Sequence, residues 1–305
     1  MYGFSISNLE LSKRFFSSCP VLETLNTIGS DVQTDNHRNF TVDSLSLEKF
    51  SYTRSHKHLL PENDNVTNII KLCAPNLEDF FCSFFLTPDY SLEISSPLSG
   101  VSFQVRLNAQ KQDESAETYE NLPSKEKAVY AKRMLKYLGA VSMVRDMGLS
   151  PGFLEVLSQA PDLLSCQQLH LYNLQDLSLL MWLTRGSLRA LAYLLSISPN
   201  ITRLFLESKQ STLTGVGDDW ETGLSLPGML SHLKYVEMEE AEGCDAELKL
   251  LSFLLRNAKV LEKVVNFFRS TVDLPDKSRV RQVEQFKDKL RAVPTASLSI
   301  KMLFY

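Results

Sequence analysis

The chain has 305 residues, of which 44% are hydrophobic and 22% are charged. This length and composition allow a sizeable buried core in one elongated domain or two compact ones, and they exclude a disordered protein. The formal net charge of -4 provides no basic field, which disfavours a nucleic-acid partner.

The first residues do not resemble a secretory leader, because residues 1–11 contain no basic segment followed by an apolar one. No apolar stretch approaches the roughly 18 residues that a membrane-spanning helix needs. The five cysteines are odd in number and widely spaced, which is unlike a disulfide framework or a zinc motif. We therefore expect an intracellular protein, cytoplasmic or nuclear, with reduced cysteines and no membrane partner.

A short phrase recurs along the chain, usually after an apolar set at helical spacing. It occurs at residues 19–23 (CPVLE), 74–78 (APNLE), 198–202 (SPNIT) and 258–262 (AKVLE), with a looser copy at 160–163 (APDL). The preceding sets predict helices with one buried stripe each: Ser12/Phe15/Phe16/Cys19, Val66/Ile69/Ile70/Cys73, Phe153/Val156/Leu157/Ala160 and Leu188/Leu191/Ala192/Leu195. Proline follows most of these sets and cannot continue a helix, so the chain is expected to turn there.

After the turns, short strands are predicted in which the first, fourth and sixth positions are apolar. These strands begin at Leu22, Leu47, Leu77, Leu98, Leu138, Cys166, Ile201, Leu233 and Leu261, of which the match at Leu98 is the weakest. Their spacing brackets, and in places exceeds, the roughly 20 to 29 residues of a leucine-rich repeat. Because one unit cannot bury its apolar faces alone, stacked units are expected. The predicted fold class is α/β, an irregular leucine-rich-repeat solenoid with a curved parallel sheet and helices outside.

Two polar segments interrupt the pattern. Residues 108–127 are almost free of large aliphatic side chains and predict a surface loop or insertion, after which Ser124 caps a helix over 125–137. Residues 209–223 are rich in Ser, Thr, Gly and Asp and separate the repeats from the last part of the chain. We expect a repeat-like region at 1–223 and a carboxyl-terminal region at 224–305.

The carboxyl-terminal region predicts the order β-α-β-α-β. Its elements are a strand over 233–238, a helix with Asp245 as N-cap, a strand through 264–265, a helix over 280–293 that ends at Pro294, and an alternating strand over 298–304. This order implies parallel strands with right-handed crossovers, which extend and close the solenoid.

Several stretches resemble a known family. Residues 230–238 (LSHLKYVEM), 247–248 (EL), 254–258 (LLRNA) and 259–263 (KVLEK) are similar in order and spacing to the FBD domain of plant F-box proteins. Residues 16–23 (FSSCPVLE) likewise resemble the repeat phrase of that family. The resemblance implies a plant F-box/FBD/leucine-rich-repeat protein whose repeats hold a protein target. In that family, an amino-terminal F-box docks the adaptor subunit of a cullin-based ubiquitin ligase.

No F-box precedes the first predicted helix in this sequence. We therefore expect target recognition without adaptor docking, in either a truncated gene product or an F-box-less relative. The predicted function is a non-catalytic protein-interaction module of the ubiquitin pathway with an unidentified protein target. An enzyme with an unrecognised pocket, or a scaffold unrelated to ubiquitin ligation, remains as an alternative. An enzyme should show a deep pocket with converging titratable groups, and a solenoid an extended shallow face.

Several residue patterns superficially suggest a ligand site. His56 and His58 have no carboxylate or thiolate at ligand spacing, and residues 214–219 (TGVGDD) lack the ending of a phosphate loop. No Gly-x-Ser-x-Gly nucleophile elbow accompanies the histidines. The acidic run at 237–242 indicates a solvated strand edge in preference to a cation site. We therefore expect no catalytic, metal-binding or cofactor-binding residue.

A partner-binding surface is predicted from the fifth strand position, which should face outward on the concave sheet face because side chains alternate along a strand. That column contains Asn26, Ser51, Phe81, Ser102, Ser142, His170, Phe205, Glu237 and Val265. Aromatic anchors in polar surroundings are typical of protein-binding surfaces. The residues expected to bind a partner are Phe81, His170, Tyr172, Arg203, Phe205, Glu207, Tyr235 and Glu237. The alternative is that Phe81 or Phe205 lies beneath a loop such as 209–223.

Overall fold

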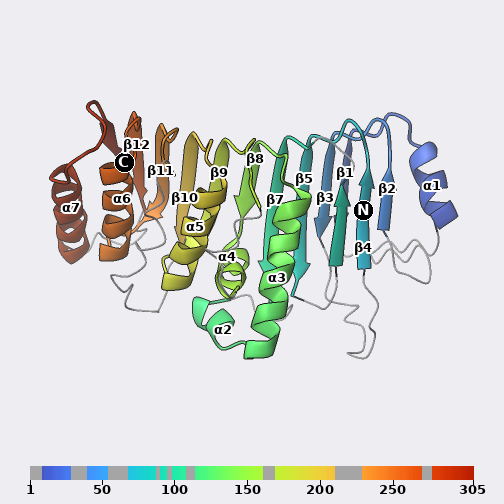
Figure 1. Ribbon diagram of the computed structural model, residues 1–305, viewed down its shortest axis with the longest axis horizontal. Coiled ribbons are helices and arrows are strands. Elements are labelled where there is room, and N and C mark those ends of the chain that lie inside the picture. Colours follow the sequence, from blue (N-terminus) through green and yellow to red (C-terminus); the bar gives the residue numbers. More distant parts are fainter. Residues whose placement is uncertain are drawn as a thin grey trace.

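The computed structural model describes residues 9–28, 40–53, 68–86, 90–94, 98–107, 114–160, 169–209, 229–269 and 277–305. A ten-stranded parallel sheet runs along the long axis of the molecule (Figure 1). Its order is β1 (Thr24–Ile28), β3 (Lys49–Thr53), β5 (Asp79–Phe85), β7 (Gly100–Arg106), β8 (Asp146–Leu149), β9 (Asp176–Trp182), β10 (Arg203–Lys209), β11 (Tyr235–Ala241), β12 (Lys263–Phe268) and β13 (Lys301–Phe304).

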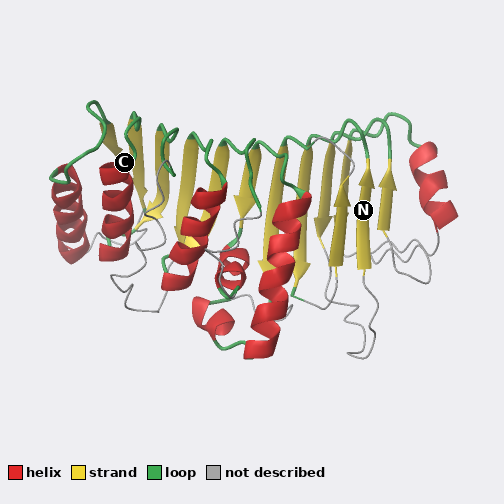
Figure 2. Cartoon of the chain, viewed as in Figure 1, coloured by secondary structure: helices red, strands yellow, loops and turns green. Residues whose placement is uncertain are grey.

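A second layer lies along one side of this sheet and consists of helices and a small sheet (Figure 2). The helices are α1 (Leu9–Ser17), α2 (Ala116–Glu120), α3 (Ser124–Ala140), α4 (Pro151–Ser158), α5 (Arg185–Ile197), α6 (Asp245–Asn257) and α7 (Lys277–Arg291). The small parallel sheet has the order β2 (Phe40–Asp43), β4 (Asn68–Cys73) and β6 (Tyr90–Ile94). The arrows of β2 and β4 point opposite to those of the large sheet, because the chain returns through this layer (Figure 1).

Consecutive units are joined at the amino ends of the large-sheet strands by a repeated pair of backbone hydrogen bonds. The carbonyl of Glu23 accepts the N–H groups of Glu48 and Lys49 at 2.8 and 2.9 Å, and the carbonyl of Glu48 accepts those of Glu78 and Asp79 at 2.8 and 3.1 Å. The same pairing continues from unit to unit through the carbonyls of Glu78, Ser99, Arg145, Gln175, Thr202 and Lys234. We call this series the carbonyl ladder.

The turns before the strands are tied by side chains of the recurring phrase. Asn76 donates from Nδ2 to the carbonyl of Leu45 at 2.7 Å, and Asn200 donates to the carbonyl of Tyr172 at 2.8 Å. Each of these asparagines directly precedes a buried apolar residue that starts a unit. The Pro-Asn phrase thus satisfies a carbonyl of the preceding unit at the point where the chain turns.

Most of the predicted elements are present. The α/β class with a large parallel sheet is confirmed. Seven of the predicted strands are present, but each begins two residues after its predicted start, and those starts are Leu22, Leu47, Leu77, Leu98, Ile201, Leu233 and Leu261. The predicted order β-α-β-α-β is formed by β11, α6, β12, α7 and β13, all parallel. Helix α6 begins one residue after its N-cap Cys244, not after Asp245, and the Glu247 carboxylate accepts the N–H of Cys244 at 3.0 Å.

Other predictions are wrong for identifiable reasons. Three members of one predicted helical set, Ile69, Ile70 and Cys73, belong to strand β4, in which Ile70 and Leu72 are buried and Lys71 is exposed; Val66 of that set lies outside the described residues. The predicted strand at Leu138 lies in α3 instead, because positions one and four of the template also match the i, i+3 spacing of a helix. Residues 108–113 of the predicted polar loop lie outside the described residues, and its later part contains α2, whose Tyr119 is buried.

Some predictions fall outside the described residues. These are the strand start at Cys166, the looser phrase at 160–163 after its first residue, the histidines at 56 and 58, and residues 210–223 of the proposed separating loop. The predicted boundary between 223 and 224 lies there as well.

The core occupies the space between the two layers, and replacing a residue at its centre should destabilise the protein. Leu204 is fully buried on β10 and lies in register with Leu177 and Val236. We expect Leu204→Ala to lower the free energy of unfolding by about 2–5 kcal/mol, because it leaves a cavity. Urea denaturation would measure this loss, with Val21→Ala at an exposed site as the control, and equal effects of the two changes would contradict the assigned core.

Candidate functional site

The face of the large sheet opposite the second layer carries a continuous row of partly exposed residues. Strand pairing places in this row Asn26, Ser51, Phe81, Ser102, Gly148, Ser178, Phe205, Glu237 and Val265. The neighbours of Phe205 along its strand, Leu204 and Leu206, point the other way into the core. Val265 is buried, so the open part of the row ends at β11.

Two members of the predicted column are not in this row. Ser142 follows α3 in a turn, and His170 precedes β9. The segment that follows His170 is a turn and not a strand. Leu171 is buried there and donates its N–H to the carbonyl of Ile197 at 2.8 Å. His170 stacks on Tyr172, with ring centroids 5.0 Å apart. Of the predicted binding residues, the structure therefore brings together six on β5, β10 and β11, and it places His170 and Tyr172 outside the strands.

Gly148 and Ser178 take the places predicted for Ser142 and His170, and sequence reasoning missed both. The signal was available, because the same template with apolar first, fourth and sixth positions also starts at Val144 and at Leu174. Both of these residues are buried, and the carbonyls that follow them belong to the carbonyl ladder.

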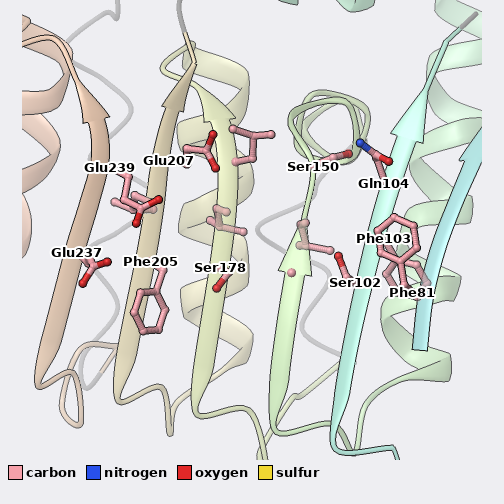
Figure 3. A pocket seen from close by; sticks show the side chains of 15 residues that line it. Phe81, Ser102, Phe103, Gln104, Ser150, Ser178, Phe205, Glu207, Glu237 and Glu239 are labelled. Carbon is pink, nitrogen blue, oxygen red and sulfur yellow. The ribbon is translucent and has the colours of Figure 1, made fainter. Parts of the chain in front are cut away.

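The row encloses a hollow, which we call the sheet trough. Two adjoining hollows of about 410 and 490 Å³ share five lining residues: Phe81, Ser102, Gly148, Ser178 and Phe205. Small residues on β7, β8 and β9 form the floor, and a phenylalanine stands at each side (Figure 3). The floor residues are closely packed against one another, because a Cβ on Gly148 would lie 3.1 Å from Ser102 Oγ.

The β10–β11 side of the trough combines aromatic rings with carboxylates. Phe205 and Tyr235 pack with centroids 5.6 Å apart and a tilt of 52°. The Tyr235 hydroxyl donates to Glu237, and Lys263 Nζ lies 5.4 Å from the Tyr235 ring centroid. Burial and the hydrogen bond to Glu237 raise the pKa of Tyr235 to about 12, so this phenol stays protonated at neutral pH.

Glu207 and Glu239 face the same hollow as Glu237 (Figure 3). Partial burial, followed by the nearby charges of Glu237 and Glu207, raises the pKa of Glu239 above its ordinary value. These carboxylates therefore repel one another, and a cation placed among them would relieve that repulsion.

The opposite end of the trough contains a linked group of charges on β8, β9 and β10. Arg203 donates two hydrogen bonds to the carboxylate of Asp176 through Nε and a terminal nitrogen. Burial, and then the hydrogen bond and charge of Asp176, raise the pKa of Asp146 to about 6. Burial tends to raise the pKa of Asp176. Hydrogen bonds from Arg203 and Asp146 outweigh burial and hold this pKa below its ordinary value. The two aspartates therefore share one proton between about pH 4 and pH 6, and both are mostly ionised at neutral pH.

Within the described residues, no three His, Cys, Asp or Glu side chains are grouped in a way that could hold a metal ion. Of the helices described, none is long and apolar enough to cross a membrane.

A parallel sheet with one open face and a returning layer of helices defines an α/β protein consistent with a leucine-rich-repeat-like fold. Comparison with known proteins shows what the chain is similar to: residues 226–265 match the FBD family, and 94% of the chain is similar to F-box proteins of the plant Arabidopsis thaliana. The resemblance to plant F-box/FBD/leucine-rich-repeat proteins is thereby confirmed.

Three relatives illustrate the similarity. A putative F-box/FBD/LRR-repeat protein is 28% identical over 295 residues, which cover 94% of this chain and 56% of the relative. An FBD-associated F-box protein is 29% identical over 292 residues (94% and 57%), and F-box/LRR-repeat protein 13 is 25% identical over 294 residues (94% and 58%). All three are from Arabidopsis thaliana, and the chain spans less than three-fifths of the length of each.

The shared proton of the two aspartates makes stability depend on pH. The pKa of Asp146 is higher in the folded chain than its ordinary value of 3.8, so its contribution is present below about pH 4 and is lost as the pH rises through about 6. The lowered pKa of Asp176 contributes stability that is present above pH 3.8 and is lost only at lower pH, outside the range of the thermal measurement. We expect Asp146→Asn to stabilise the protein by about 0.5 kcal/mol at pH 7.5, because it removes a like charge beside Asp176, and to change little at pH 4.5.

Thermal unfolding of both proteins from pH 4.5 to 7.5 measures this effect. Asp288→Asn, at an exposed aspartate of α7, is the control for loss of one negative charge. A difference between wild type and Asp146→Asn that stays constant across this range would contradict the shared proton.

Proposed function

We propose that the chain is an irregular leucine-rich-repeat solenoid that acts as a non-catalytic protein-interaction module. The observation that carries this proposal is the open face of the large sheet, where partly exposed aromatic rings stand beside a shallow trough among polar groups. An apolar ring on an exposed strand position contributes little to the core but provides an anchor for a partner.

The family similarity supports a role in target recognition. The matched relatives are F-box proteins by name, and the family resemblance implies that the repeats of such proteins hold the target. We propose that residues 1–305 provide this target-holding part in an intracellular setting, and the proposal does not include adaptor docking. The repeat-like region at 1–223 and the FBD-like region at 224–305 would act as one surface, because β10 and β11 pair continuously across five residues.

The proposal is tested at the aromatic pair of the open face. We expect Phe205→Ala combined with Tyr235→Ala to weaken capture of the partner from plant extract at least tenfold. The same change should lower the free energy of unfolding by only about 1 kcal/mol, the contribution of an aromatic pair at a partly exposed site. Quantitative affinity purification and urea denaturation provide the two measurements.

The chain offers a matched aromatic control outside the strand row. His170→Ala combined with Tyr172→Ala removes a second stacked pair, and we expect it to leave capture unchanged. Equal loss of capture in both double variants would move the binding surface away from the open sheet face. A loss of several kcal/mol of stability in the Phe205/Tyr235 variant would show that these rings belong to the core.

A further inference from the structure

The charges around the sheet trough indicate the chemistry of its partner. The two hollows are lined by six carboxylates and one guanidinium: Asp79, Asp146, Asp176, Glu207, Glu237 and Glu239 against Arg203. This negative excess of five is larger than the formal net charge of -4 of the whole chain, so the rest of the chain carries a slight positive excess. The acidity is therefore concentrated in the trough.

This negative charge is only partly neutralised within the described residues. Arg203 is engaged with Asp176, and the charges of Arg145 and Arg203 act on both Asp146 and Asp176. Asp79 has a distant pairing with Lys49 at 3.8 Å between exposed side chains. Burial first, and then like-charged neighbours, raise the pKa values of Glu239 and Asp146. A low-dielectric sheet surface between the two acidic ends strengthens their attraction for a cation.

The shape of the trough suits a polypeptide. From Phe81 on β5 to Phe205 on β10 there are four strand spacings, or about 19 Å, across a floor of small side chains. This width admits a strand or a helix of another chain between the two rings. The faces of Phe81 and Phe205 can receive the alkyl stems or the guanidinium groups of basic side chains.

From the trough's walls, floor and charge, we propose that the sheet trough binds a lysine- and arginine-rich segment of another protein, placed across β7, β8 and β9. The basic groups would reach Glu207, Glu237 and Glu239 at one end and Asp79 and Asp146 at the other. This inference rests on the proposed function and adds the class of partner.

Direct binding tests the inference without knowledge of the natural partner. The probes are fluorescein-labelled 12-residue peptides made of three copies of Lys-Arg-Gly-Ser, Gln-Gln-Gly-Ser or Glu-Asp-Gly-Ser, and fluorescence anisotropy gives the Kd. We expect only the basic peptide to bind the intact chain. The triple variant Glu207→Gln, Glu237→Gln, Glu239→Gln should weaken that binding about tenfold or more, since three favourable charge contacts are lost.

A control of equal charge separates the trough from general acidity. Glu23→Gln, Glu48→Gln, Glu78→Gln removes three exposed glutamates at the amino ends of β1, β3 and β5, and we expect less than a twofold change in Kd. Ser178→Phe keeps every charge but fills the floor, and it should weaken binding about as much as the trough triple variant. Equal weakening by the two triple variants, or undiminished binding to Ser178→Phe, would overturn the assignment.

Other occupants give distinct results. Self-association of the intact chain in light scattering that disappears in the trough triple variant would identify a second copy as the occupant and overturn the inference. Failure of the basic peptide to bind would also overturn it, while the proposed function would stand if Phe205→Ala with Tyr235→Ala still reduced capture of a natural partner. If the basic peptide did not bind and the Phe205→Ala, Tyr235→Ala variant still captured the natural partner normally, the proposed function itself would be contradicted.

Discussion

The architecture depends on one repeated constraint, the backbone carbonyl that accepts two N–H groups from the next unit. Glu23 binds Glu48 and Lys49 in this way, and the series continues to Lys234, which accepts from Glu262 and Lys263. Each pair fixes the height at which the next strand begins, so all strands of the large sheet start at the same edge. The acceptor follows an apolar residue that must be buried, and this ties the register of the sheet to the core.

Once the register is fixed, the alternation of side chains determines both faces of the sheet. At β10, Leu204 and Leu206 are buried while Phe205 and Glu207 face the trough, because successive side chains point to opposite sides. The intervening units can then vary in length without moving the strands. This explains how the long insertion between β7 and β8, which includes α2 and α3, leaves Ser102 paired with Gly148.

The sequence predicts this architecture well where the apolar template is joined to the turn phrase. Leu77 and Ile201 follow Pro-Asn and were placed correctly, and even the weak match at Leu98 begins a unit. Leu138 failed because an i, i+3 pair fits a helix as well as the first and fourth template positions, and Val144 fits the same template six residues later. The small sheet was not predicted, because the apolar residues around Ile70 fit a helical period as well as the alternation that β4 adopts.

The candidate site could be predicted only in part, because the apolar template locates residues along single strands but does not show which strands pair. Phe81, Phe205 and Glu237 were placed in the correct row by alternation alone. The hollow between them requires Gly148 and Ser178, which have no apolar or aromatic signal of their own and enter the row only through strand pairing. The grouping of Asp146 with Asp176 and Arg203 likewise joins three units that are distant in sequence and adjacent across the sheet. The trough is therefore a property of the register, and the same carbonyl ladder that orders the core also gathers its charges.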